Sequence, residues 1–412
     1  MPAPYSTEIL RMFALHTQGL GVGSMAFGGS SLGGLVSLVR RLGAVQIDTL
    51  QMVARSQYLV LWTRLGVYSV ADFDDLLFDG SDRQLYEFWY HAACVIPVSE
   101  YRYGIPRMVV SGRRSQWLHE KRNRALTDAV RDRITNEGPL SSADFADDQV
   151  KRGSWWDWKP AKYALSILFD LGEIMVCKRV NFRRYYDLTE RVLPGWVDTT
   201  PPSWEEMVRH HLERAVLALG VCLPTQAGDY THMKRTQARP IVDALVDEGV
   251  FAEIEGQLYD GTITTLIVHR DSLPDLERVA AGEIQSRHTT FLSPFDSLFW
   301  ARGRDEQFWG FKQVLEAYKP ARDRKWGYFC LPILYQDRLI GRFDPKLERK
   351  TGVLKLKAVH LEPGVKPNAD MVEAIAQAMR DFMAFHNATE LVVEYSTDKP
   401  FATALHRAVK GA

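Results

Sequence analysis

Residues 44–50, Ala-Val-Gln-Ile-Asp-Thr-Leu, hold the side chains best suited to chemistry, because apolar and polar residues alternate there. Side chains two apart in a strand share a face about 6.6 Å apart, so Gln46 and Asp48 should converge on one side. A carboxylate can stabilise an oxocarbenium-like centre or deprotonate a water, and an amide can position that water because it both donates and accepts. On spacing alone, such residues more often face solvent or cap neighbouring backbone.

The elements around this strand follow from capping and glycine signals. The sequence predicts helices over 6–17, 32–42 and 56–65, with Ser6 or Thr7 as the first N-cap and Gly43 ending the second helix. The glycine-rich stretch after the first helix is not preceded by a strand, and no Gly-Lys-Ser/Thr closes it. These two features exclude a phosphate-binding P-loop.

Two later segments each predict a winged helix, which places one helix in a DNA groove and its hairpin on the backbone. In the first segment we expect helices over 123–136, from Ser141 or Ser142 to 147 and over 160–171, then strands 173–177 and 185–188 joined by a basic loop. In the second we expect helices over 204–219, from Thr225 and over 235–248, then a tight hairpin of strands 250–254 and 257–259 around Glu255-Gly256.

The last third of the chain predicts a different architecture, with strands over 328–334, 338–343, 353–360 and 391–395 and a helix over 369–385. We therefore expect an α+β protein: tandem winged-helix domains followed by a β-rich, barrel-like C-terminal domain. The expected boundaries are 1–117 for an N-terminal winged-helix-like domain with the Gln-Ile-Asp motif, 118–196 and 203–290 for the second and third winged helices, and 291–412 for the C-terminal domain.

Composition sets the broad class. The 412 residues are 46% hydrophobic and 25% charged, with a net charge of zero, as in a soluble globular protein of several domains. No apolar run approaches a membrane span and the N-terminus lacks signal-peptide features, so we expect a cytoplasmic protein, nucleoid-associated if bacterial. The four cysteines form no CxxC pair, so we expect neither a metal nor a cofactor and interpret them as buried apolar residues.

Charge is segregated along the chain although its sum is zero. Residues 101–125 hold seven Lys/Arg and one acid, 318–360 hold eleven and four, and 70–88 hold six acids and one Arg. Such segregation can create a positive surface on a neutral protein, or leave solvated faces that never converge.

Several stretches together resemble one family. They are Gln46–Leu50, Arg55–Arg64, Phe88–Ala93, Leu292–Asp296, Leu331–Tyr335 and Arg338–Arg342. In this order they resemble the winged-helix DNA glycosylases of the YcaQ/AlkX and AlkZ group, whose catalytic motif is Gln, an apolar residue, then Asp or Gln. Gln46-Ile47-Asp48 has the YcaQ/AlkX form. Where family members often carry a His pair, this chain has Gln57-Tyr58.

The resemblance implies three tandem winged helices and a C-terminal β-barrel around a DNA cleft, with Gln46 and Asp48 as catalytic residues. It implies excision of N7-alkylated guanines from double-stranded DNA and unhooking of interstrand crosslinks. Such a base is cationic and already a good leaving group, so one carboxylate and one amide suffice to stabilise the sugar cation and deliver water. A lyase would need a nucleophilic lysine, and the nearest one in sequence is Lys121. We therefore expect a monofunctional, monomeric glycosylase.

Other residues are candidates for substrate or DNA contact, each with a structural alternative. His91 could line the site or be a hydrogen-bonded core histidine, and Arg55 and Arg64 could hold phosphates or pair with nearby acids. The remaining candidates are Tyr58, Arg107, Arg113, Arg114, Lys234 and Arg235. A non-catalytic winged-helix regulator would explain the DNA-binding units equally well but not Gln46 with Asp48. A nuclease would need a metal-binding carboxylate cluster, which the sequence lacks.

Overall fold

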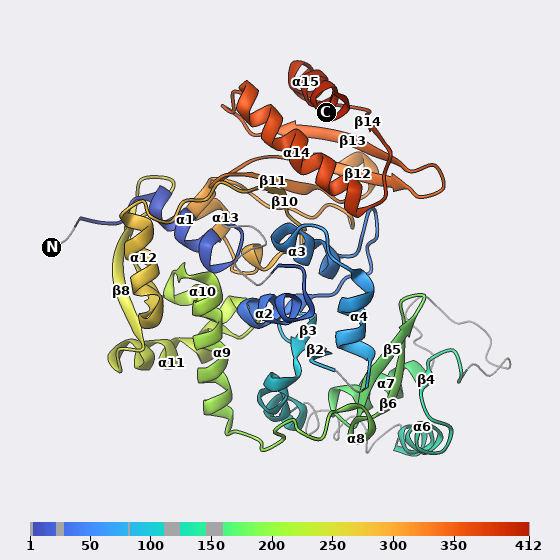
Figure 1. Cartoon of the computed structure of the whole chain (residues 1–412). Coiled ribbons are helices and arrows are strands. Elements are labelled where there is room, and N and C mark those ends of the chain that lie inside the picture. The colour runs from blue at the N-terminus through green and yellow to red at the C-terminus, as the bar shows by residue number, and fades with distance from the viewer. Residues whose placement is uncertain (1–2, 22–28, 81–82, 111–123, 146–159, 412) are drawn as a thin grey trace. The chain divides into compact units, whose positions relative to one another are not determined.

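The computed structural model describes residues 3–21, 29–80, 83–110, 124–145 and 160–411 (Figure 1). The chain divides into two compact units. Unit 1 comprises residues 1–70, 90–94 and 211–412, and unit 2 comprises 71–89 and 95–210. The fold mixes helices with four sheets, as the sequence predicted for an α+β protein.

One order of elements recurs along the chain: a helix, a short strand, further helical structure and a β-hairpin, with the short strand beside the second hairpin strand. The N-terminal copy follows α1 (Thr7–Thr17) and has strand order β1-β3-β2. Its elements are α2 (Leu32–Leu42), β1 (Val45–Gln46), α3 (Ser56–Leu65), α4 (Val70–Phe78), β2 (Leu85–Trp89) and β3 (Ala93–Pro97).

Local signals explain the N-terminal helices. The Ser31 hydroxyl accepts the Gly34 N–H at 3.1 Å and so caps α2. Gly43, at φ +74°, then ends this helix in a backbone conformation that disfavours a side chain. The predicted strand over 44–50 is shorter than expected. It ends at Gln46 because the chain turns at Asp48, whose carboxylate accepts the Leu50 N–H at 2.8 Å.

The second copy lies in unit 2 and has strand order β4-β6-β5. Its described elements are α6 (Arg124–Glu137), β4 (Leu140–Ser141), α7 (Pro160–Asp170), β5 (Ile174–Val180), β6 (Arg183–Leu188) and α8 (Thr189–Val192). The basic loop predicted over 178–184 is mostly strand, because the hairpin pairs as far as Val180 with Arg183 and turns only at Asn181-Phe182. Most of the short helix predicted from Ser141 or Ser142 to 147 lies outside strand and helix, and 146–147 are outside the described residues.

The third copy lies in unit 1, apart from the first turns of its first helix, and has strand order β7-β9-β8. Its elements are α9 (Trp204–Leu219), β7 (Val221–Cys222), α10 (Pro224–Tyr230), α11 (Arg235–Asp247), β8 (Phe251–Gln257) and β9 (Ile263–His269). The helices agree with the prediction, but the hairpin turn at Glu255-Gly256 was wrong. Gly256 lies within β8, where a Cβ would meet Leu10 and Leu266 side-chain atoms at 2.8 and 2.6 Å.

The C-terminal part of unit 1 is a five-stranded sheet in the order β10-β11-β12-β13-β14. Its strands are β10 (Thr289–Phe291), β11 (Leu331–Tyr335), β12 (Arg338–Glu348), β13 (Val353–Leu361) and β14 (Glu390–Val393). Only the last pairing is parallel. The β-rich prediction is confirmed. The barrel is not closed in the described chain, since β10 and β14 are the two edges of the sheet.

Helices cover this sheet and link it to the N-terminal segment. α14 (Ala369–Phe385) packs on β10 and β11, and α15 (Lys399–Lys410) packs on α14 (Figure 1). Trp62 of α3 contacts Phe291 and Phe382 at ring-centroid distances of 6.2 and 4.9 Å. Further helical structure comprises α12 (Leu273–Ala280), α13 (Arg304–Trp309) and residues 101–110. 3-10 turns lie at Val98–Glu100, Arg270–Ser272, Ser297–Phe299 and Ala321–Asp323.

A buried ion pair fixes α3 to the segment before α13. Arg64 and Asp296 are both fully buried and form a bidentate pair with N–O distances of 2.7 and 2.9 Å. The Arg64 Nε–H also donates to the Gln18 carbonyl at 2.7 Å. Every charged atom therefore has a partner, as a buried ion pair requires.

We predict that Asp296→Ala lowers the free energy of unfolding by about 3–5 kcal/mol, because it leaves the Arg64 guanidinium buried without its counter-ion. Urea denaturation measures the change. Asp243→Ala, which breaks the exposed Arg239–Asp243 pair, is the control and should change stability far less, because solvent screens an exposed pair. Equal effects of the two substitutions would mean that the buried pair does not hold the fold together.

Candidate active site

Gln46 and Asp48 flank a residue that is pinned to the neighbouring strand. The Ile47 N–H donates to the Ala93 carbonyl at 2.8 Å, and the Val45 and Ile47 side chains are buried. Gln46 and Asp48 are both half-buried. Burial thus alternates along 45–48, with Val45 and Ile47 buried and Gln46 and Asp48 half-buried.

The environment of Asp48 makes its carboxyl group harder to ionise. Partial burial raises the pKa of Asp48 above its ordinary value, while the N–H groups of Leu50 and Thr49 and the charge of Arg55 act in the opposite direction. Burial is the largest of these effects. Raised carboxyl pKa values are common where a carboxylate takes part in chemistry.

The loop after Asp48 is tied to the C-terminal sheet. The Leu347 N–H of β12 donates to the Met52 carbonyl at 3.0 Å, and Arg349 donates to the Val53 carbonyl at 2.5 Å. The Arg55 guanidinium closes the loop by donating to the Thr49 carbonyl at 2.8 Å. The motif is thus held from one side by Ala93 and from the other by β12.

Tyr318 is a neighbour of Asp48 that sequence reasoning missed. Its side chain is 77% exposed, and partial burial first and the Asp48 charge second raise the pKa of its hydroxyl. Two residues earlier, the buried Glu316 carboxylate accepts the Trp326 N–H at 2.7 Å and pairs with Lys319 at 3.0 Å. No sequence signal links Tyr318 to a motif some 270 residues earlier in the chain.

His91 occupies the turn between β2 and β3, two residues before the Ala93 that pairs with Ile47. Its ring Nδ1–H donates to the Tyr230 carbonyl at 3.2 Å. Burial first and the nearby His232 second lower the pKa of His91 to about 4, although the backbone of Tyr230 and the backbone and charge of Asp229 act in the opposite direction. The ring is therefore neutral at physiological pH.

The candidates on α3 have different surroundings. Arg55 and Tyr58 are half-buried at its start, and the Tyr58 carbonyl accepts the Tyr68 hydroxyl at 3.1 Å. A phosphate contact by Arg64 is not possible here, because its guanidinium is fully buried and bonds to Asp296 and Gln18. Gln57 is 5% exposed, and its Oε1 is a buried acceptor with no hydrogen-bond partner among the described residues.

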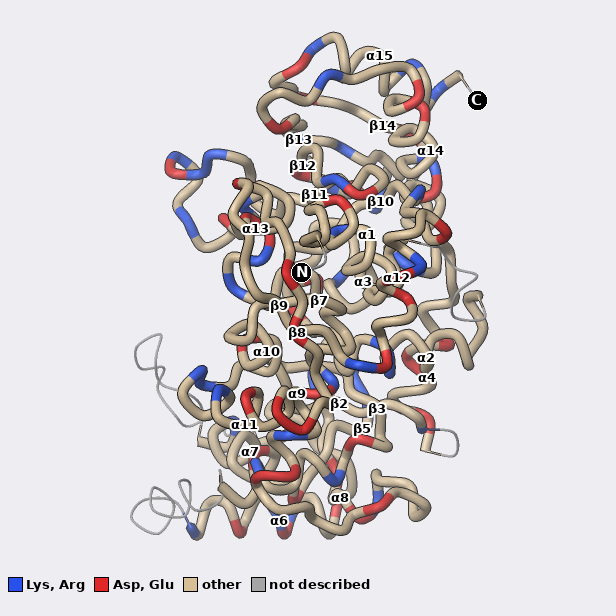
Figure 2. Tube along the Cα trace, turned by 90° about the vertical axis from the view of Figure 1, so that its left-hand side faces the viewer, with Lys and Arg blue, Asp and Glu red and all other residues tan. Residues whose placement is uncertain are grey.

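The basic candidates are spread over both units. Lys234 and Arg235 are exposed at the start of α11 in unit 1, where Arg235 pairs with Asp229 at 2.6 Å. Arg107 is half-buried in the helical stretch 101–110 of unit 2, and Arg113 and Arg114 lie outside the described residues. Acidic and basic residues are interspersed along much of the trace (Figure 2). In the segment 318–360, Lys319, Arg342, Lys355 and Lys357 have acidic partners.

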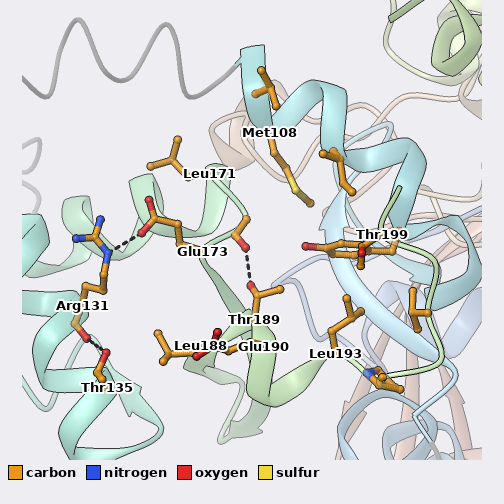
Figure 3. Close-up of a pocket in the computed structure, with 17 residues that line it drawn as sticks. Met108, Arg131, Thr135, Leu171, Glu173, Leu188, Thr189, Glu190, Leu193 and Thr199 are labelled. Atoms are coloured by element: carbon orange, nitrogen blue, oxygen red, sulfur yellow. Dashed lines mark hydrogen bonds and ion pairs between the residues drawn. The ribbon is translucent and has the colours of Figure 1, made fainter. Parts of the chain in front are cut away.

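A cavity of about 950 Å³ lies in unit 2, away from these residues in the chain (Figure 3). Apolar side chains such as Met108, Leu171 and Leu193 line it, and the Arg131–Glu173 pair, 2.6 Å apart, lies at its side. None of the candidate residues named from the sequence is part of its lining. The cavity therefore carries no part of the predicted chemistry.

Across the described part of the chain, no three His, Cys, Asp or Glu side chains are arranged to hold a metal ion. The cysteines are free there, with Cys94, Cys222 and Cys330 buried as expected and Cys177 half-buried. No described helix is long and apolar enough to cross a membrane.

Comparison with known proteins gives this geometry a context. DNA glycosylase AlkZ from Streptomyces sahachiroi has a similar fold, with a TM-score of 0.64 and 15% sequence identity, over 95% of this chain and 100% of that one. Residues 39–385, which include Gln46, Asp48, His91 and Tyr318, match the profile of the family described as DNA glycosylase AlkZ-like. The match covers well over half of the chain, which therefore belongs to the AlkZ-like DNA glycosylase family.

Proposed function

We propose that this glycosylase hydrolyses the N-glycosidic bond of N7-alkylated purines in double-stranded DNA, and that Gln46 and Asp48 carry the reaction. The observation that supports this most directly is that both side chains are half-buried on either side of Ile47, whose N–H donates to the Ala93 carbonyl. An amide and a carboxylate held two residues apart can act on the same sugar and the same water.

The proposed division of labour follows from the two side chains. The alkylated purine is cationic and leaves without strong protonation, so the transition state is dominated by positive charge on the sugar. The Asp48 carboxylate stabilises that charge and accepts a proton from water, and the Gln46 amide positions the water. Water rather than an amine attacks, which makes the enzyme monofunctional.

DNA binding in this proposal uses the three repeated segments as winged helices. Each has the short strand beside the hairpin that this motif requires. Arg55, Tyr58, Lys234, Arg235 and Arg107 are proposed contacts, and Arg113 and Arg114 are further ones in the basic stretch beyond residue 110. Membership in a glycosylase family disfavours the alternative of a non-catalytic regulator.

The proposal extends to interstrand crosslinks. A guanine tied to the opposite strand cannot swing into the tight pocket of a base-flipping enzyme. Gln46 and Asp48 would act on the sugar and the water, so neither needs to enclose the base. We therefore propose an open site that tolerates bulky N7 substituents.

Substitution of Asp48 tests the assignment. Asp48→Asn should slow release of N7-methylguanine by roughly 100-fold or more, because the amide cannot carry the negative charge. The substitution should leave DNA affinity and folding intact. Gln46→Ala should also slow the reaction. Base release is measured under single-turnover conditions, with the exposed Asp323→Asn as a matched control. Full activity of Asp48→Asn would remove Asp48 from the mechanism.

The pH profile should reflect the raised pKa of Asp48. Activity needs the carboxylate, so the rate should fall with falling pH, with a midpoint above 3.8, the ordinary value for aspartate. Ionising a group whose folded pKa is raised destabilises the fold, so Asp48→Asn should melt at the same or a higher temperature at pH 7. That difference should vanish below the ordinary pKa. An acid limb at or below the ordinary value, or a less stable Asp48→Asn at pH 7, would contradict this.

A comparison of two substrates tests the open site. The enzyme should release N7-methylguanine and should also unhook an N7–N7 nitrogen-mustard crosslink, because the base stays near its stack. Gel electrophoresis of the crosslinked duplex measures unhooking. Release of the methylated base without any unhooking would leave an alkylpurine glycosylase with an enclosed site.

A further inference from the structure

Three aromatic rings form a ladder in unit 1. The His91 ring is stacked on His232 at 4.7 Å with 9° between the planes, and on Trp300 at 4.6 Å with 3° between the planes. No stacking of His232 on Trp300 is found among the described rings, so His91 is the middle rung. Trp300 is 5% exposed and contacts the fully buried Tyr230. One end of the ladder is therefore anchored in the core.

The other end of the ladder is open. His232 is exposed, so its outer face has no ring of the described chain upon it, while its inner face is covered by His91. Its Nδ1–H donates to the His91 carbonyl at 2.6 Å, which fixes the plane of the ring. An exposed, flat and oriented aromatic face is what a planar ligand requires for stacking.

The backbone at His232 is held in an uncommon conformation. Its φ is +56°, in the left-handed region that side chains other than glycine seldom adopt. The surrounding chain fixes it, since its N–H donates to the Asp229 carbonyl at 3.1 Å and the Met233 N–H donates to the Gly228 carbonyl at 2.9 Å. Strained residues that the fold maintains are often functional.

A short stretch of chain joins the ladder to the Gln46–Asp48 motif. His91 is two residues from Ala93, and the Ala93 carbonyl accepts the Ile47 N–H between Gln46 and Asp48. Two residues of extended chain span about 7 Å, which is about two base steps of B-DNA. Exposed Lys234 and Arg235 lie two and three residues after His232 and can contact the phosphates of the same strand.

We propose that His232 is a stacking platform for a nucleobase of the bound DNA, within a few base steps of the nucleotide on which Gln46 and Asp48 act. The inference rests on the proposed function for the position of the damaged nucleotide. The ligand class is a purine or pyrimidine ring with one open face. The platform fixes the DNA relative to the motif, so His232 is a binding and positioning residue.

The charge state of the ladder is compatible with stacking. The pKa of His91 is lowered to about 4, by burial first and by His232 second. The middle ring is therefore uncharged at neutral pH. Stacking of a base on an aromatic ring does not require base-specific hydrogen bonds. The platform should accept any of the four bases.

Two substitutions distinguish the contribution of the His232 ring from that of its backbone conformation and hydrogen bond. His232→Asn removes the ring but suits the left-handed conformation and can still donate to the His91 carbonyl. His232→Phe keeps a ring. Thr236→Ala, at an exposed position four residues on, is the control. Thermal melting establishes that each variant is folded.

The experiment uses an Asp48→Asn background and duplexes with one N7-methylguanine, each carrying one 2-aminopurine one to four steps away on either strand. We expect one position at which the protein changes 2-aminopurine fluorescence, a change that His232→Asn abolishes and His232→Phe preserves. Affinity should fall about tenfold or more in His232→Asn, and single-turnover base release in the otherwise unchanged enzyme should slow.

Two outcomes would overturn the proposal. One is a His232→Asn variant that matches the parent in fluorescence, affinity and rate. The other is a His232→Phe variant as weak as His232→Asn, which would mean that an aromatic ring at this position does not restore binding. Failure of the parent enzyme to release N7-methylguanine would instead contradict the proposed function. DNA affinity and 2-aminopurine fluorescence do not depend on catalysis, so these two failures remain distinguishable.

Discussion

The fully buried pair of Arg64 and Asp296 is the interaction on which the site depends most. It joins α3, the helix that follows the Gln46–Asp48 motif, to the stretch that precedes α13. A buried charge without its partner is strongly destabilising, so the two segments cannot separate without a large cost. The Ser56 and Ser293 hydroxyls, 3.1 Å apart, join the same segments at the other end of the helix. The helix that follows the motif is thus held at both of its ends.

Other stretches that resemble the glycosylase family also make contacts that hold the Gln46–Asp48 motif in place. Arg342 of β12 is almost fully buried, pairs with Glu362 at 2.7 Å and packs on the Trp326 ring. The same strand binds the loop after Asp48 through Leu347. These stretches therefore maintain the scaffold around the motif. This explains how a fold can persist at 15% identity to AlkZ.

Local signals predicted the fold well where they were decisive and failed where packing overrode them. Ser31 and Gly43 set the limits of α2 correctly because a cap and a left-handed glycine act within one turn. Gly256 was misread as a turn, because its missing Cβ makes room for Leu10 and Leu266. Arg64 was a candidate for a phosphate or a nearby acid, but its partner is Asp296, which is 232 residues away. Tyr318 and the open face of His232 also depend on distant contacts, which one sequence does not encode locally.

The central claim is that Gln46 and Asp48 act as one unit on the same sugar and water. A double-mutant cycle tests it most directly, with single-turnover release of N7-methylguanine measured for the parent enzyme, Gln46→Ala, Asp48→Asn and the double variant. Groups that act together are not additive. The account predicts that the double variant is about as slow as the slower single variant. Losses that multiply in the double variant would contradict it, since they would mean that the two residues contribute independently.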